Sequence, residues 1–88
     1  MTRQLKLKDK DLEWVSTSDE TVILDDASEQ YFATNSAGGV LWDALKDGST
    51  ASGLAELLVE RFEIDRSQAE SDVNDFVTQL DELEMLEA

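Results

Sequence analysis

The first third of the chain carries apolar residues in short runs separated by polar turns, a pattern typical of strands. In the first run, Leu12 and Trp14 alternate with their neighbours over residues 12–17. The second run, residues 21–24, is rich in β-branched side chains, and residues 31–34 form a third, Tyr-Phe-Ala-Thr. Three consecutive strands joined by short connections favour an antiparallel meander.

The rest of the chain has apolar residues three and four positions apart, the spacing of amphipathic helices. Three helices are predicted, each preceded by side chains suited to capping, and these are Asn35 or Ser36, Ser49 or Thr50, and Asp65 or Ser67. Gly48 is expected to end the first helix. The last helix has the most regular apolar stripe, which consists of Ala69, Val73, Phe76, Val77, Leu80 and Leu83.

Three strands followed by three helices predict an α+β domain, with a winged helix-turn-helix-like arrangement of helices on one face of a three-stranded antiparallel sheet. A chain of 88 residues is long enough for one small core. We expect residues 11–88 to form this single domain. Residues 1–10 are expected to be a flexible basic segment that leads into it.

The net charge of −14 is unevenly distributed. The first ten residues hold four of the seven basic side chains, which are Arg3, Lys6, Lys8 and Lys10. The remaining acidic surface repels phosphate backbones and anionic lipids, so we expect neither nucleic acid nor a membrane as a partner. The same charge favours a basic partner and a monomer. With no export signal and no cysteine, the chain is expected to be cytoplasmic.

The residues that most often perform catalysis are missing. There is no histidine and no cysteine, so the usual bases, thiolate nucleophiles and zinc ligands are excluded. Paired carboxylates such as Asp25 and Asp26 arise by chance in a chain with 21 acidic residues. The stretch after Asp25 fails as a calcium loop because Ala27 and Gln30 occupy positions that need an oxygen ligand and a glycine. We therefore expect a non-enzyme without cofactor or metal.

The third strand, residues 31–34, is predicted to lie at an edge of the sheet without lysine or proline to protect it. Its free backbone groups suit β-augmentation by an extended, basic peptide, because main-chain hydrogen bonds set the register and side-chain pockets add specificity. An alternative stays open at this point: the last helix or the N-terminal segment could cover this edge.

The stretch "YFATNSAGGVLWDALKDGSTASGLAELLVERFEID", followed by "AESDVNDFVTQLDELEML", resembles the PqqD-like family of precursor-peptide recognition elements. The similarity extends over about residues 12–86. The matching positions are Tyr31-Phe32, Asn35, Gly38, Trp42, Asp47-Gly48, Thr50, Asp72-Val73, Phe76 and Leu80. Thr34 departs from the family pattern, which has leucine there, and Glu29-Gln30 lack the glycine that usually precedes the aromatic pair.

The resemblance implies a non-catalytic adaptor for a ribosomally made precursor peptide. Family members add the leader segment of the precursor as a strand beside the third strand, against the last helix, and present it to a modifying enzyme or leader peptidase. Transferred to this sequence, the implied peptide-binding residues are Tyr31, Phe32, Ala33, Thr34, Asp72, Val73, Asp75, Phe76, Val77 and Leu80. Size and freestanding form resemble the leader-binding proteins of lasso-peptide pathways. The alternatives are a PqqD-type chaperone for a radical SAM enzyme and a protein-binding winged-helix regulator.

Overall fold

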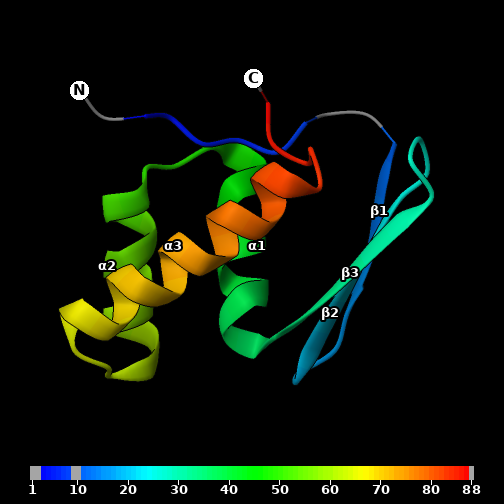
Figure 1. Cartoon of the computed structure of the whole chain (residues 1–88). Coiled ribbons are helices and arrows are strands. Elements are labelled where there is room, and N and C mark those ends of the chain that lie inside the picture. Colours follow the sequence, from blue (N-terminus) through cyan, green and yellow to red (C-terminus); the bar gives the residue numbers. More distant parts are fainter. Residues whose placement is uncertain (1–2, 9–10, 88) are drawn as a thin grey trace.

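The computed structural model, which describes residues 3–8 and 11–87, has three strands followed by three helices (Figure 1). The strands are β1 (Leu12–Ser16), β2 (Glu20–Asp25) and β3 (Gln30–Asn35). The helices are α1 (Ser36–Asp47), α2 (Ala51–Phe62) and α3 (Arg66–Glu82). The predicted α+β fold and the order of its elements are confirmed. No helix within the described ranges is long and apolar enough to cross a membrane.

Each helix begins at one of the predicted capping residues. The side chains of Asn35, Thr50 and Asp65 accept hydrogen bonds from the backbone N–H groups of Gly38, Gly53 and Gln68, at 3.0, 3.0 and 2.8 Å. These bonds satisfy amides that have no partner inside the helix. At the end of α1, Gly48 has a φ of 98°, which a residue with a side chain rarely adopts.

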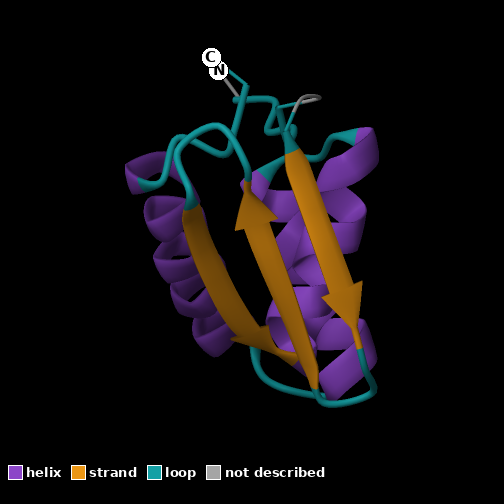
Figure 2. Ribbon diagram, turned by 90° about the vertical axis from the view of Figure 1, so that its right-hand side faces the viewer, coloured by secondary structure: helices purple, strands orange, loops and turns teal. Residues whose placement is uncertain are grey.

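The sheet has the order β1-β2-β3, and both pairings are antiparallel. Figure 2 shows the three strands in front of the helices, so the helices cover one face of the sheet. Along β2 the residues alternate between the two faces. Thr21, Ile23 and Asp25 are buried, whereas Val22 and Leu24 point outward and are 38% and 40% exposed.

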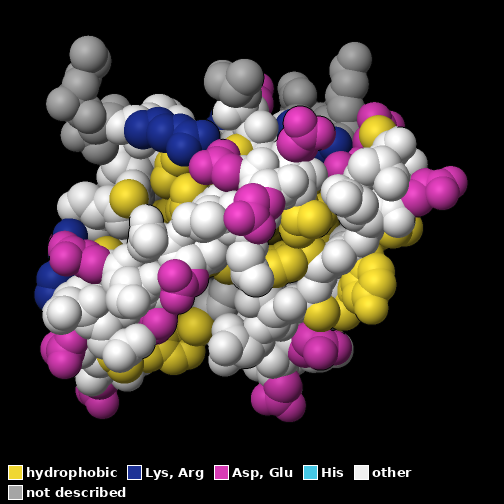
Figure 3. Space-filling model, viewed as in Figure 1, with side chains coloured by type: hydrophobic (Ala, Val, Ile, Leu, Met, Phe, Trp, Pro, Cys, Tyr) yellow, Lys and Arg dark blue, Asp and Glu magenta, His cyan; other side chains and the backbone are white. Residues whose placement is uncertain are grey.

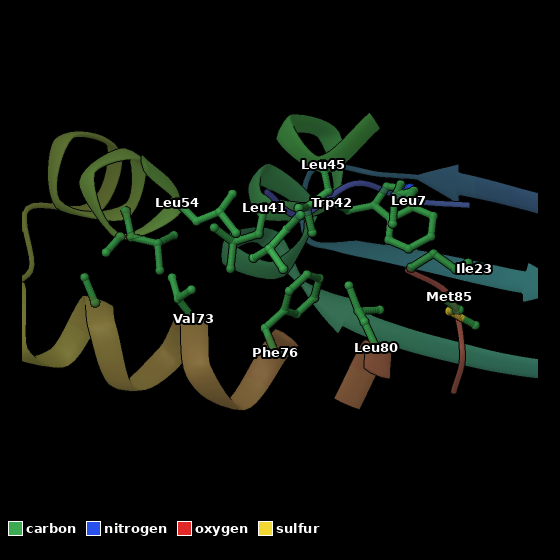
Figure 4. Close-up of a cluster of buried hydrophobic side chains, with 14 residues drawn as sticks. Leu7, Ile23, Leu41, Trp42, Leu45, Leu54, Val73, Phe76, Leu80 and Met85 are labelled. Carbon is green, nitrogen blue, oxygen red and sulfur yellow. The ribbon is translucent and has the colours of Figure 1, made fainter. Parts of the chain in front are cut away.

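The core lies between the sheet and the helices (Figure 4). Ile23 is the fully buried apolar residue of the sheet, and the three helices supply most of the other members. These are Leu41, Trp42 and Leu45 of α1, Leu54, Ala55 and Leu58 of α2, and Ala69, Val73, Phe76 and Leu80 of α3. Met85, after α3, is also buried, so the chain folds back onto the core beyond the last helix.

The N-terminal segment differs from the flexible lead-in that the sequence predicted. Leu5 and Leu7 are 3% and 5% exposed and belong to the core cluster. Leu5 pairs with Ser49, and Leu7 with Leu86, through isolated β-bridges. Residues 3–8 are therefore part of the domain, because the alternation of apolar and charged residues places two leucines inward. Residues 1–2 and 9–10 of the predicted segment lie outside the described residues.

Candidate functional site

The open edge of β3 follows from the hydrogen-bond pattern of the sheet. In antiparallel strands, the backbone groups of alternate residues point to opposite edges. The β1–β2 hairpin is anchored by bonds from Thr17 N to Glu20 O and from Asp26 N to Asp11 O, both 2.8 Å long. With the observed register, this pattern directs the backbone of Val22 and Leu24 toward β1. The intervening residues of β2 are directed toward β3.

The same alternation assigns the backbone groups of β3. Phe32 and Thr34 lie opposite Ile23 and Thr21 and bond to β2. Tyr31 and Ala33 therefore direct their N–H and C=O groups away from the sheet. Among the described residues, no strand pairs with this edge. The edge can thus offer two donors and two acceptors to an added strand.

A groove lies between the end of β3 and α3, and we call it the β3 groove. Its volume is about 210 Å³. Thr34 lines it from β3, Leu41 from α1, Leu58 from α2, and Asp72, Asp75, Phe76 and Gln79 from α3. Figure 3 shows apolar side chains between β3 and α3, with carboxylates around them. The groove therefore offers an apolar floor and an acidic rim.

An aromatic contact joins the two walls of the β3 groove. The rings of Phe32 and Phe76 meet edge to face, with centroids 5.8 Å apart and an interplanar angle of 61°. Phe76 is buried and Phe32 is half-buried. This contact holds β3 close to α3 and sets the distance between the strand edge and the helix.

The acidic rim comes from one side of α3. Asp75 is exposed and Asp72 is half-buried, where it accepts a hydrogen bond from Gln68 Nε2 at 2.8 Å. Further along α3, Arg3 forms two hydrogen bonds to Asp81, at 3.0 and 3.1 Å, and lowers the pKa of that carboxyl. Neither Asp72 nor Asp75 is in a salt bridge with a described residue. Both are placed to attract a basic ligand.

The structure brings some of the expected binding residues together and separates others. Four of them line the β3 groove, namely Thr34, Asp72, Asp75 and Phe76. The ring of Phe32 contacts that of Phe76. The side chains of Tyr31 and Ala33 lie on the outer face of the sheet, opposite Leu24 and Val22. These two residues therefore present backbone groups, and not side chains, along the open edge.

Three expected residues of α3 do not line the β3 groove. Val73 and Leu80 are 1% and 0% exposed and belong to the core, while Val77 is half-buried and lines, with Val73, a cavity beside the start of α2. The reason is helix geometry: one residue turns the helix by about 100°, so the core stripe and the groove stripe are adjacent but distinct.

Six residues that line the groove are not among the binding residues expected from the sequence, namely Asn35, Ala37, Gly38, Leu41, Leu58 and Gln79. Gln79 follows Asp72, Asp75 and Phe76 at helical spacing, so extending their stripe by one turn would have found it. Leu41 and Leu58 belong to other helices and read as ordinary core positions. Only the tertiary packing places them at the floor of the groove.

The fold and the site can be compared with those of known proteins. The family profile described as coenzyme PQQ synthesis protein D (PqqD) matches residues 20–86, which is most of the chain and includes β2, β3 and all three helices. The chain belongs to the PqqD family. This membership confirms the family resemblance read from the motifs. A search of the curated proteins found no match.

Two solved structures are similar to this PqqD family member over nearly their full length. TbiB1 in complex with the TbiA(beta) leader peptide has a TM-score of 0.81 and 26% sequence identity, covering 94% of this chain and 95% of that chain. Lasso peptide synthetase B1 complexed with the leader peptide has a TM-score of 0.78 and 27% identity, covering 96% and 98%. Both similar proteins were thus determined with a leader peptide bound.

Proposed function

We propose that this chain is a non-catalytic adaptor that binds the leader segment of a ribosomally made precursor peptide by strand addition to β3. The observation that carries the proposal is the position of the outward backbone groups of Tyr31 and Ala33 beside the β3 groove. An added strand at this edge directs alternate side chains over the apolar floor. Similarity to two leader-bound proteins supports the identity of the ligand.

The free energy of such binding has two main parts. About four backbone hydrogen bonds, two each to Tyr31 and Ala33, contribute roughly 0.5–1.5 kcal/mol apiece. Burial of two or three leader side chains adds about 1.5–3 kcal/mol each, before the cost of ordering the peptide is subtracted. Micromolar to sub-micromolar affinity is the expected result. Hydrogen bonds alone do not provide it, so the groove must take side chains.

Charge indicates which leaders the site prefers. Asp72 and Asp75 lie at the groove of a chain whose net charge is −14. A leader with lysine or arginine near its groove-facing residues is favoured, and an acidic leader is disfavoured. The adaptor would then present the rest of the precursor to a leader peptidase of a lasso-peptide pathway.

An amide NMR titration with the leader encoded beside this gene tests the proposal. We expect shifts to concentrate at residues 30–35 and at Asp72, Asp75, Phe76 and Gln79. The amides of Ala51 and Ser52, at the start of α2 and outside the β3 groove, serve as an internal control and should change little. A spectrum that does not respond to the leader would refute the function while leaving the fold unchanged.

A second candidate partner is a radical SAM enzyme, which the match to the PqqD profile itself favours. An adaptor for either enzyme uses the same peptide site, so the titration does not distinguish the two candidate partners. A binding measurement with the purified leader peptidase or radical SAM enzyme encoded nearby distinguishes them. A winged-helix regulator would instead dimerise through α3 and ignore the leader.

A further inference from the structure

A second and larger groove lies at the opposite edge of the sheet, between β1 and the helices, and we call it the β1 groove. Its volume is about 550 Å³. Trp14 and Ser16 line it from β1, Val40 and Trp42 from α1, and Leu57 and Phe62 from α2. Trp14 and Phe62 are 40% and 37% exposed. Large apolar side chains are thus left in contact with water beside an open strand.

The backbone of β1 is open along this groove. Because Val15 and Glu13 bond to β2, the alternation turns the N–H and C=O groups of Trp14 and Ser16 outward. Within the described parts of the chain, β1 pairs with β2 alone. The β1 edge therefore presents the same kind of main-chain groups as the β3 edge.

The indole of Trp42, a residue that lines this groove, carries a buried polar group. The indole Nε1–H of Trp42 is buried and finds no acceptor among the described residues. Buried N–H groups are normally hydrogen-bonded, and leaving one unsatisfied is costly. The ring of Trp14 packs edge-on against Trp42, with centroids 5.6 Å apart. Because Trp14 and Trp42 both line the β1 groove, a segment bound there lies beside this pair of rings.

These three features fit one kind of occupant, an extended polypeptide segment. Its backbone can pair with Trp14 and Ser16, one of its carbonyls can accept from Trp42, and an apolar side chain can fill the space beside Leu57 and Phe62. The charged groups at the groove are mixed, Arg61 against Asp43 and Asp47. This groove therefore lacks the purely acidic character of the β3 groove that favours a basic leader.

We infer that the β1 groove docks an extended, largely apolar segment of the leader peptidase that receives the precursor. This inference rests on the proposed function, since it assigns the surface through which the adaptor meets its enzyme. The two grooves lie at opposite edges of one sheet. Leader and peptidase can consequently occupy the protein together, as presentation of a substrate requires.

The test uses the full chain and the purified leader peptidase encoded beside it, with calorimetry for both the leader and the peptidase. The variants Trp14→Glu and Phe62→Glu place a charge in the β1 groove. Val15→Glu is the matched control, because Val15 neighbours Trp14 on β1 but is 71% exposed on the outer face of the sheet. Leader affinity, measured on every variant, reports whether the protein is folded.

We expect both groove variants to weaken peptidase binding by at least about tenfold, as loss of a central aromatic contact does. Leader affinity should be unchanged, and Val15→Glu should leave both affinities unchanged. If Trp14→Glu does not fold, Phe62→Glu at the end of α2 carries the test.

In the wild-type protein, the indole NMR signal of Trp42, assigned with Trp14→Phe, should move when the peptidase is added. Normal peptidase binding by Phe62→Glu, or loss of binding by Val15→Glu alone, would overturn the inference. A wild-type protein that binds leader but no peptidase would also overturn it. Failure to bind the leader at all would instead refute the proposed function.

Discussion

The ring of Phe32 in β3 meets the ring of Phe76 in α3 edge to face, at a centroid distance of 5.8 Å. This contact joins the two elements that the proposed ligand must lie between. Since Phe76 also lines the β3 groove, the pair couples the stability of the fold to the shape of the site.

A double-mutant cycle with Phe32→Leu and Phe76→Leu tests this coupling. We expect the two changes to be non-additive in the free energy of unfolding by about 0.5–1.5 kcal/mol, the usual strength of an aromatic pair beyond its buried area. Urea denaturation of the four proteins measures it. Phe76→Leu should also weaken leader binding, because its ring forms part of the groove floor. Strictly additive effects would show that the two rings do not stabilise each other, although they lie in contact.

The direction of the backbone groups in β3 leads to a sharper prediction. Proline at Ala33 removes an outward N–H group and leaves the bonds to β2 in place, so the protein should stay folded and bind the leader about two- to tenfold more weakly. Proline at Phe32 removes an N–H group that bonds to β2, so it should destabilise the sheet. Circular dichroism and leader calorimetry distinguish the two effects.

The matched pair also defines the result that would contradict strand addition. If Ala33→Pro folds and binds the leader with wild-type affinity, the outward groups of β3 are not used. The same result at Tyr31→Pro would exclude an added strand along this edge altogether.

The amino-acid pattern predicted the fold well because each element depends on local signals. Asn35, Thr50 and Asp65 cap helices through their own side chains, and the β-branched run of β2 has a fixed alternation. The N-terminal segment was misjudged for a different reason. Leu5 and Leu7 become part of the core only through bridges to Ser49 and Leu86, which lie far away in the sequence.

The candidate site was predictable only in part. Residues 31–34 were recognisable as an edge, but which of them point outward depends on the pairing of β1 with β2. On α3, the apolar residues Val73 and Leu80 were expected to bind the peptide, but both belong to the core. The polar Gln79 lines the groove instead. The periodicity of one helix does not show which of two adjacent stripes meets the core.

The acidic rim predicts a salt-dependent contribution to binding. Asp72→Asn and Asp75→Asn should each weaken a basic leader by about 0.2–1 kcal/mol at low salt, and the loss should shrink as salt is added. Asp19→Asn, in the turn between β1 and β2, changes the net charge equally at an exposed site outside the groove. Equal effects of all three variants would indicate a general charge effect instead of a local contact.

Gly38 is required by packing at the start of α1. A Cβ atom at this position would overlap the side chain of Thr34 in β3. Gly38→Ala should therefore destabilise the protein by about 1–3 kcal/mol and disturb the mouth of the β3 groove.

Gly53→Ala is a matched control, because Gly53 holds the same position relative to its cap in α2. There the new Cβ would approach the Ser49 hydroxyl, which can turn away, so we expect little loss of stability. Thermal unfolding of the two variants compares them directly.

A partly buried ion pair joins the N-terminal segment to the sheet. Nζ of Lys8 lies 2.7 Å from Oδ2 of Asp25, whose side chain is 2% exposed. Asp25 also accepts from the backbone N–H of Ala27 at 3.1 Å. The hydrogen bond from Lys8 lowers the pKa of Asp25, and burial opposes this effect only in part.

This lowered pKa predicts how stability depends on pH. Because the pKa of Asp25 is lower in the folded state than its value of about 4 in the unfolded chain, its contribution is present above pH 4 and is lost as the pH falls through the folded-state pKa. The difference in free energy of unfolding between wild type and Asp25→Asn should therefore shrink between about pH 6 and pH 2.5. Lys8→Met should cost about 1–3 kcal/mol near neutral pH, since it leaves a buried carboxylate without its cation. Urea unfolding across this pH range measures both, and a wild-type-to-Asp25→Asn difference that does not change with pH would contradict the role of the pair.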